Sequence, residues 1–414
     1  MKKTLLLSVV ASTMIMAGGD IAPVEPVVEA PVVKETTSGW DFSGEAALYF
    51  QTMDQSQNAG VVGPLITGTP DLFAQESSAA NVGLRVSAVN TNMFAGIGAG
   101  FELVGLGTLG LENDIVSSVM QTGDGSLNSG AITQAYLTYG IGNTSLKVGR
   151  QTLPKALSPF AFSETWNVFQ NTFGAALLVN SDLPDTTLVG AYVADANSHA
   201  NLSAFDELNQ KGIYMLTAQN KSISGLALTG TYYYAPEMFI TEDAHILWGD
   251  ALFSISDYAI GLQGGTILTG EPTGITDTVA FGAKAGATFG MFNVGAAYTS
   301  VDEGTVGIAN LAGGTTFSET PLYTQMLANV NHIARDNDTF VVNAGIDILG
   351  GNLGVVYGYT TDNQTANSDY TEIDVAFKTN ITENTSLLAA YIYADDETAT
   401  DVNNIIRVWG RYNF

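Results

Sequence analysis

Eight charged residues stand at the polar positions of stretches whose side chains alternate between apolar and polar. They are Glu45, Arg85, Glu102, Lys147, Lys284, Glu372, Asp374 and Arg407. If these stretches are strands around a channel, the charges face water, where fixed charges at a narrow point set ion selectivity and orient polar solutes. The alternative is that they form ion pairs that only brace the wall. Four are basic and four are acidic, so we expect a nearly neutral belt.

The segment 152–172 holds a further set of candidate residues. Arg150 precedes it, and Lys155 and Glu164 are its charges. Its bulky apolar residues and prolines are Pro154, Pro159, Phe160, Phe162, Trp166 and Phe169. A loop in water does not normally carry that much aromatic surface, so we expect it to pack on the inner wall of a barrel or on a neighbouring subunit. Arg150, Lys155 and Glu164 would then line a constriction; an outer cap packed among other loops is the alternative.

Residues for catalysis are scarce. The three histidines are His199, His245 and His332, and none lies in a His-Glu-x-x-His helix or beside a nucleophile motif. A barrel enzyme would need a histidine paired with Ser or Asp near its rim, and His245 is the only candidate. The glycines of 105–110 match a dinucleotide fingerprint, but a polar loop follows where that motif needs a helix. We therefore expect neither an enzyme nor a cofactor.

The composition excludes several classes of protein. Asp and Glu number 41 against 14 Lys and Arg, a net charge of −27, whereas a nucleic-acid binder needs a basic surface. There are 0 cysteines, which removes disulfides, thiolate catalysis and cysteine-ligated zinc. Charged residues make up 13%, about half the ~25% usual in soluble proteins. Yet no apolar run of about 18 residues follows the N-terminus, so the apolar residues are abundant but spread out.

The N-terminus predicts export. Lys2 and Lys3 precede a short apolar stretch that ends in small residues, the pattern of a secretory signal peptide over 1–17. Its removal leaves 12 basic residues (14 less two) against 41 acidic ones, a net charge of −29. Residues 18–39 carry three prolines among Val and Glu, which indicates an extended periplasmic tether. Residues 40–414 form the remaining domain.

In this domain apolar side chains recur at every second position. In 40–51, for example, Phe42, Leu48 and Phe50 share one parity and Glu45 the other. Successive side chains of a strand point to opposite faces, so each such stretch has one apolar and one polar face. Eighteen stretches of this kind can be counted, and 16 strands are also compatible with the pattern. The eighteen stretches are 40–51, 81–90, 93–106, 131–140, 144–151, 173–180, 186–195, 211–220, 225–235, 244–255, 257–268, 278–289, 291–300, 339–349, 352–361, 369–380, 385–394 and 402–414.

The connections between these stretches alternate between short and long. Eight short ones, such as Thr91–Asn92 and Gly350–Gly351, contain the residues that tolerate tight turns. The other nine are mostly longer, and the longest are 52–80 and 301–338. An open sheet would leave its edges unpaired in lipid, so it must close. We therefore predict an all-β fold: a transmembrane antiparallel β-barrel with short periplasmic turns and long extracellular loops.

Aromatic residues support a membrane location. They cluster near both ends of the strands on the apolar parity, as expected for the two girdles of a barrel in the outer membrane of a bacterium. The final residue, Phe414, ends the last strand on the lipid-facing parity. It resembles the C-terminal aromatic residue by which the barrel-insertion machinery recognises its clients. A soluble β-sandwich would explain the alternation of side chains but not the alternation of connections.

Three motifs are similar to those of a known family. They are Gly149–Leu153, Trp166–Phe173 and Asp182–Leu188, and the similarity covers roughly residues 131–195. This part of the chain resembles the porin D (Opr-type) family and the related major outer membrane porins of epsilon-proteobacteria. The resemblance implies an 18-stranded barrel, usually a homotrimer, with loop 3 (152–172) folded into the lumen. Family members that take basic amino acids have a dense arginine ladder, whereas this chain has four arginines, so that preference is not carried over.

Acidic residues dominate the other long loops: Asp302, Glu303, Asp336, Asp338, Asp395, Asp396, Glu397 and Asp401. Hard cations take oxygen ligands from such clusters, although no EF-hand spacing occurs. Solvated surface charge is the favoured interpretation. The related porins imply structural calcium as the alternative.

Together these features predict a passive porin for small hydrophilic solutes and ions. We expect weak cation selectivity, because the belt is balanced and the acidic loops then dominate. Arg407, Glu45 and Arg85 should lie side by side, since the last strand of a closed barrel pairs with the first. A surface adhesin or receptor acting through its long loops is the alternative, and a barrel enzyme is a more distant one.

Overall fold

The computed structural model of the chain describes residues 39–54, 71–239, 242–270, 272–313, 318–363, 368–399 and 401–414. The expected signal peptide and residues 18–38 of the expected tether lie outside the described residues. Among the described residues, no helix is long and apolar enough to cross a membrane. The helical elements are single 3-10 turns in the loops: η1 (Gln75–Ser77), η2 (Leu111–Asn113), η3 (Leu311–Gly313) and η4 (Asn329–Asn331).

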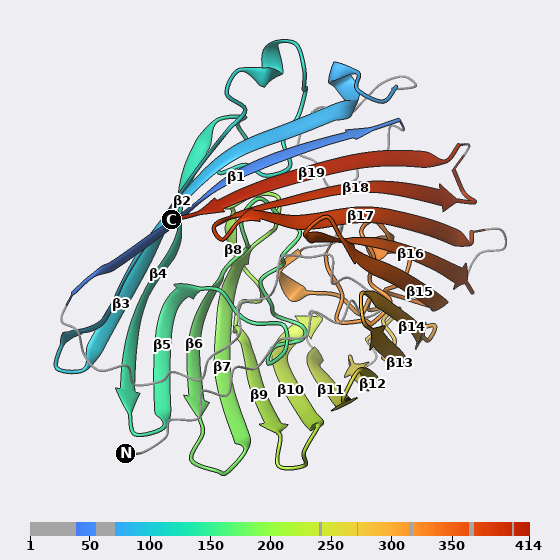
Figure 1. Cartoon of the computed structure of the whole chain (residues 1–414). Helices are drawn as coiled ribbons and strands as arrows, with labels where there is room; N and C mark the ends of the chain where they lie inside the picture. The colour runs from blue at the N-terminus through green and yellow to red at the C-terminus, as the bar shows by residue number, and fades with distance from the viewer. Residues whose placement is uncertain are drawn as a thin grey trace.

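Eighteen long antiparallel strands of the described chain form one closed barrel (Figure 1). A short extra strand, β8 (Phe205–Glu207), pairs only with the loop end of β7. The barrel strands are β1 (Asp41–Met53), β2 (Ser78–Phe94), β3 (Ile97–Gly107), β4 (Ser129–Ile141), β5 (Thr144–Gln151), β6 (Phe173–Asn180), β7 (Thr186–Asn197), β9 (Ile213–Asn220), β10 (Leu226–Phe239), β11 (Glu242–Ile255), β12 (Tyr258–Leu268), β13 (Thr278–Phe289), β14 (Phe292–Val301), β15 (Asn337–Ile348), β16 (Gly351–Asp362), β17 (Tyr370–Thr382), β18 (Thr385–Asp396) and β19 (Asn403–Asn413). The predicted fold class and the count of 18 strands are confirmed.

The first and last strands close the barrel. β1 pairs with β2 on one side and with β19 on the other. The backbone N–H of Gly44 donates to the carbonyl of Phe414 at 2.8 Å, and the N–H of Phe414 donates to the carbonyl of Gly44 at 3.0 Å. Each of the 18 barrel strands that the structure describes therefore has two neighbours, which leaves no open barrel edge in lipid.

The short turns lie at the end of the barrel where β1 begins and β19 ends. Most contain two residues, and several have the positive φ values that tight hairpins require, as at Ala95 (51°) and Gly96 (83°). This turn was expected at Thr91–Asn92. β2 instead continues to Phe94 through a register shift after Asn90, so its pairing with β3 extends further than the polar residues suggested. At the opposite end, β10 and β11 are joined by residues 240–241 alone, which is shorter than expected there.

The outer surface of the barrel is apolar. On β3, Phe101 and Leu103 are 40% and 46% exposed, whereas Glu102 between them is 6% exposed and faces inward. Near the loop end, Tyr192, Tyr214 and Tyr234 form a row of ring contacts across β7, β9 and β10, with centroids 5.2 and 6.1 Å apart. Of the aromatic residues expected near the loop ends of the strands, Tyr298, Tyr357 and Tyr391 are likewise exposed on the outer surface.

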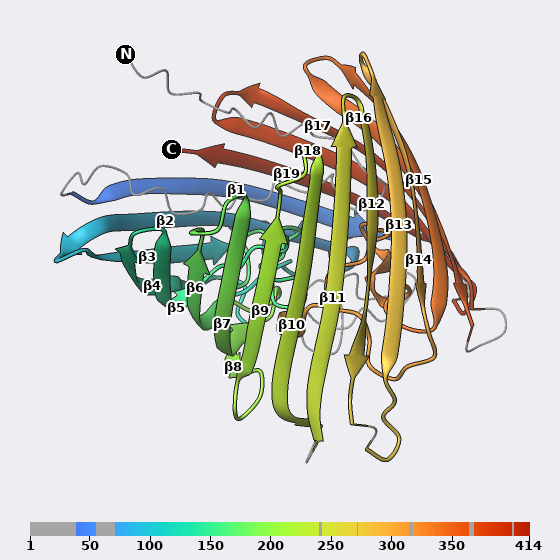
Figure 2. The ribbon, with the colours of Figure 1, turned by 90° about the horizontal axis from the view of Figure 1, so that it is seen from below.

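Loops fill much of the interior (Figures 1 and 2). Loop 3 (152–172) and loop 7 (302–336) contribute Phe160 and Ile308 to one buried cluster with inward side chains of the wall. They contribute Phe169 and Met326 to a second such cluster. These two loops meet loop 2 (108–128) and loop 4 (198–212) inside the barrel, so the loops determine the shape of the lumen.

Candidate functional site

Glu45 is the centre of a charged group on the inner wall. It lies directly opposite Arg85 in the pairing of β1 with β2, and Arg85 Nη2 is 2.9 Å from Glu45 Oε2. Arg411 of β19 forms an ion pair with Glu45 Oε1. The carboxylate is therefore held between two guanidinium groups on neighbouring strands.

Arg407 lies elsewhere, contrary to expectation. It pairs with Gln51 in the register of β1 with β19, six residues along β1 from Glu45. Its Nε donates to Gln51 Oε1 at 2.5 Å, and its Nη1 donates to the carbonyl of Leu327 in loop 7 at 3.2 Å. Six residues of strand span about 20 Å. Barrel closure fixes a stagger between first and last strands, and this stagger brings Arg411 to Glu45 in place of Arg407.

Glu102 extends the group around Glu45 to the next strand. Its Oε2 lies 3.8 Å from Arg85 Nε. It also accepts hydrogen bonds from Ser87 at 2.9 Å and Thr133 at 2.7 Å. Arg85 is thus shared by two carboxylates, which leaves no excess of basic charge on β1 to β3.

The two lysines of the belt contact aromatic rings. Lys147 Nζ lies 3.8 Å from the ring centroid of Tyr136, and Lys284 Nζ lies 4.0 Å from that of Tyr323. The Tyr323 hydroxyl of loop 7 donates to Asp250 of β11. Both lysines face inward, and a cation over an aromatic face gains electrostatic stabilisation there.

Glu372 and Asp374 also point inward, but loop 7 covers them. The two side chains are 0% and 1% exposed. The backbone N–H of Ala328 donates to Glu372 at 2.8 Å, and that of Leu327 donates to Asp374 at 3.3 Å. These carboxylates therefore anchor loop 7 to β17 more directly than they face open water.

Loop 3 packs on the inner wall at two distant places. At one end, the N–H of Phe160 donates to the hydroxyl of Tyr233 on β10 at 3.1 Å. At the other, Arg411 of β19 donates to the carbonyls of Asn167 at 2.7 Å and Val168 at 3.0 Å. The loop thus extends inside the barrel from β10 to β19.

Glu164 of loop 3 and Glu319 of loop 7 each accept hydrogen bonds from the backbone of the other's loop. Glu164 Oε1 accepts from the N–H of Glu319 at 3.2 Å. Glu319 Oε1 accepts from the N–H groups of Thr165 at 3.1 Å and Trp166 at 3.3 Å. Nδ1 of His199 in loop 4 lies 3.3 Å from Glu164 Oε2, an ion-pair distance without hydrogen-bond alignment. We call Glu164, Glu319 and His199 the loop clamp.

Burial and charge shift the protonation of the loop clamp. Burial, followed by the nearby charge of Glu164, raises the pKa of Glu319 from 4.5 to about 7. For His199, burial lowers the pKa, but the Glu164 and Glu319 carboxylates outweigh it, so the pKa is raised overall. The loop clamp therefore changes charge near neutral pH.

Arg150 and Lys155 are placed differently from each other. Lys155 lies inside, 4.8 Å from the ring centroid of Phe162. Arg150 has the same parity as the outward-facing Val148, and its guanidinium holds loop 4 by donating to the carbonyl of Leu202 at 2.6 Å. The guanidinium thus ties the end of β5 to loop 4, and a role of Arg150 in the constriction stays a prediction.

The remaining histidines and the acidic residues of the described loops contact other groups of the protein. His245 faces outward, with Nδ1 2.7 Å from the Tyr232 hydroxyl, and His332 stacks on Tyr370 at 3.9 Å. Asp302 accepts from the N–H groups of Val279 and Gly304. Across the described ranges, no three His, Asp or Glu side chains gather closely enough to hold a metal ion. Calcium binding by the loops stays a prediction.

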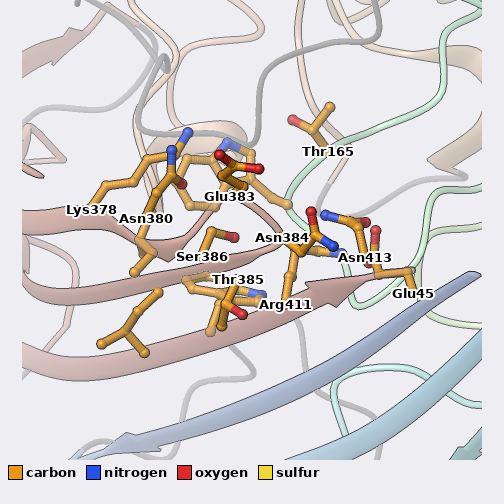
Figure 3. A pocket seen from close by; sticks show the side chains of 14 residues that line it. Glu45, Thr165, Lys378, Asn380, Glu383, Asn384, Thr385, Ser386, Arg411 and Asn413 are labelled. Atoms are coloured by element: carbon orange, nitrogen blue, oxygen red, sulfur yellow. Dashed lines mark hydrogen bonds and ion pairs between the residues drawn. The ribbon is translucent and has the colours of Figure 1, made fainter.

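Two cavities flank loop 3 near the turn end. One, of about 370 Å³, is lined by loop 3 and by the group of Glu45, Arg85 and Glu102. The other, of about 300 Å³, lies against β17 to β19 (Figure 3). Glu45, Arg411 and Thr165 line both, so the contact of loop 3 with Arg411 separates them. A third cavity of about 80 Å³ adjoins the loop clamp and Arg407.

The analysis of the sequence missed four residues of this site. Arg411 and Asp250 stand at inward positions of predicted strands, so the alternation alone could have found them. Glu319 and His199 lie in loops, where no periodic signal gives the direction of a side chain. Their proximity to Glu164 follows from how three loops fold together.

The chain was compared with known proteins. No protein-family model and no curated protein sequence matches it. Solved structures do match. OccK8 (OprE) of Pseudomonas aeruginosa is 14% identical with a TM-score of 0.68, over 91% of this chain and 98% of that one. OccAB3 of Acinetobacter baumannii is 14% identical with a TM-score of 0.68, over 90% and 99%.

Two further similar structures contain small organic molecules. P. aeruginosa OpdK with vanillate is 14% identical with a TM-score of 0.69, over 90% of this chain and 98% of that one. P. aeruginosa OccK2 (OpdF) in complex with glucuronate is 12% identical with a TM-score of 0.69, over 92% and 99%. The barrel and its apolar outer surface indicate a protein of the bacterial outer membrane. The chain shares the closed barrel fold of these structures.

Proposed function

We propose that the protein is an outer-membrane porin through which small hydrophilic solutes and ions diffuse passively. The observation that carries this proposal is the closed barrel itself. Its outer surface is apolar, and charged side chains line cavities in its interior. Charge at membrane depth is tolerated toward water or a partner, not toward lipid. The wall therefore encloses a polar path, and the fold is shared with porins.

Loop 3 forms the constriction in this proposal. Its contacts with Tyr233 and Arg411 support a path across the lumen. The loop clamp joins it to loop 7, so the two loops narrow the channel together. The ligands named for the similar structures, vanillate and glucuronate, are of the size that such a channel would pass.

The charges support weak cation selectivity. Arg411 and Lys378 are further basic groups inside the barrel, and Asp250 and Glu383 are further acidic ones, so the interior charges stay balanced. Arg85 and Arg411 are each paired with Glu45. The negative charge of the acidic loops then concentrates cations at the mouth of the channel. The effect extends over a screening length of about 8 Å at physiological salt.

Single-channel recording in planar bilayers tests the porin function. The purified chain should give stepwise conductance, and a salt gradient should give a reversal potential on the cation side. The preference should weaken as salt rises, because surface charge is screened. A folded barrel that never conducts would contradict the porin and favour an adhesin or receptor.

Assembly in this proposal follows related barrels. We infer a homotrimer whose outer surface contacts outer-membrane lipid. We also infer that the barrel-insertion machinery recognises Phe414. That residue is exposed, and its backbone pairs with Gly44 at the seam. Truncating Phe414 should lower the yield of inserted barrel more than a Phe73→Ala substitution in a loop, measured by membrane fractionation.

A further inference from the structure

The cavity of about 300 Å³ beside loop 3 has the size at which ligand pockets begin. We call it the seam chamber. Loop 3, the hairpin of β17 and β18, and the end of β19 form its walls. Figure 3 shows Lys378, Asn380 and Glu383 on one side, and Glu45 and Asn413 on the other. It adjoins the cavity beside Arg85 and shares Glu45, Thr165 and Arg411 with it.

The fixed charges of the seam chamber compensate one another. Arg411 and Glu45 form an ion pair, and Arg85 binds the other oxygen of the same carboxylate. Arg411 also donates to two carbonyls of loop 3. Lys378 and Glu383 add one charge of each sign. An ion of either sign would therefore gain little from this lining.

The rest of the lining is rich in neutral groups that both donate and accept hydrogen bonds. They are Thr165, Asn380, Asn384, Thr385, Ser386 and Asn413. Two indoles, Trp166 and Trp409, lie in the same wall, with ring centroids 5.5 Å apart. Hydroxyl and amide groups match a solute that carries many hydroxyls. An indole offers a flat apolar surface to the C–H face of such a solute.

We propose that the seam chamber binds uncharged polyhydroxylated solutes of monosaccharide size. This inference rests on the proposed porin function and names a solute class for it. A sugar ring presents hydroxyls at its edge and C–H groups on its faces, and the chamber offers partners to both. A charged solute loses solvation on entry, and the lining has no net charge to compensate for that loss.

Three sugars that share the same type of ring but differ in charge test this inference. Glucose, added to the turn side of the full chain in a planar bilayer, should reduce the conductance in a saturable way. Glucuronate and glucosamine should block less at the same concentration. If glucuronate or glucosamine blocks more tightly than glucose, a fixed charge selects the solute and the inference is wrong. Equal and unsaturable effects of all three would mean that only their volume matters, which also overturns it.

Two variants place the effect in the chamber. Trp166→Ala should raise the half-blocking glucose concentration about three- to tenfold, from the loss of one aromatic contact. Asn384→Ala lies on a turn outside loop 3, so it tests the same wall without disturbing that loop. Matched controls are Trp40→Ala, on the outer girdle, and Asn143→Ala, on another turn. Unchanged block in both chamber variants would overturn the inference.

The outcomes separate this inference from the porin function. A chain that conducts but shows no glucose block disproves the solute class alone. A folded chain that does not conduct disproves the porin, and the solute class with it.

Discussion

At the scale of single residues, Glu45 controls the balance of charge. Glu45→Gln leaves Arg85 and Arg411 without their shared carboxylate. We expect the reversal potential to shift toward anions. Removing one charge about 4 Å from the path in water changes the local ion energy by about 1 kcal/mol, or about fivefold in concentration. The measurement is the reversal potential in a KCl gradient.

Glu303→Gln is the matched control for Glu45→Gln. It removes the same charge from an exposed position of loop 7, where salt screens it. Its effect should be smaller and should vanish at high salt. Equal shifts in the two variants would show that the belt has no special influence. A wild-type channel that prefers anions at low salt would show that the basic residues dominate.

Glu372 makes a different prediction, because it holds loop 7. Glu372→Ala leaves the N–H of Ala328 without its acceptor, which costs about 1–3 kcal/mol. Loop 7 should then separate more easily from β17. Chymotrypsin should cleave after Tyr323 or Leu327, both 8% exposed in the folded chain, faster than in the wild type. Glu372→Gln keeps an acceptor and should be cleaved at an intermediate rate; equal rates in all three would contradict the anchor.

The sequence predicted single residues well where strands set their direction. The pairing of Glu45 with Arg85 and the inward direction of Glu102 follow from alternation and hairpin order. The place of Arg407 does not, because the stagger at closure is a property of the whole barrel. For Arg150, alternation gives only the parity of Val148, whereas its bonds to Thr172 and Leu202 depend on how loops 3 and 4 fold.

At the scale of elements, loop 3 is the main test. Deleting Ser158–Glu164 removes the contact of Phe160 with Tyr233 and one of the three residues of the loop clamp, Glu164. We expect a higher single-channel conductance, because loop 7 is released together with loop 3. An equally long deletion in loop 2, at 109–115, is the control. Unchanged conductance in a folded deletion variant would place loop 3 outside the permeation path.

The loop clamp predicts a dependence on pH. Raised pKa values of Glu319 and His199 mean that the clamped state is most stable below their ordinary values, and loses stability as pH rises through about 7 for Glu319. For Glu319 the loss is about 3 kcal/mol at most. Lys155 and Arg407 are the basic groups beside it, and they oppose the loss in part. Conductance should therefore be higher at pH 8 than at pH 5.5.

Glu319→Gln imitates the protonated form of the loop clamp. At pH 8 it should conduct like the wild type at pH 5.5, and most of the pH dependence should disappear. Glu303→Gln on the same loop should keep it. If Glu319→Gln retains the full wild-type dependence, another group is responsible.

The elements show where analysis of the sequence stops. Period-two patterns located the strands, since each has one face in lipid and one inside. Loops 2, 4 and 7 have no period, and their contacts join residues far apart in the chain, as Glu164 and Glu319 do. The aromatic content of 152–172 predicted that this loop packs on another surface. It did not predict that loop 7 forms part of that surface.

At the scale of the whole molecule, closure predicts resistance to unfolding. All barrel strands have two hydrogen-bonded neighbours, so no edge is available to detergent or to another chain. Unheated samples should migrate as a compact trimer with β-type far-UV circular dichroism, and heating should convert them to slower or dissociated forms. A helical spectrum would contradict the fold, whereas a compact monomer would contradict only the trimer.

The hydrogen bonds between Gly44 and Phe414 have a consequence for the timing of synthesis. The first strand leaves the ribosome early, but one of its two partners, β19, follows all the other barrel strands. Until then, both ends of the growing sheet are edges that could pair with any other strand. Contacts of such long sequence separation also form slowly. The cell must therefore keep the chain unfolded throughout its export, and a chain shortened at its C-terminus can never complete the ring.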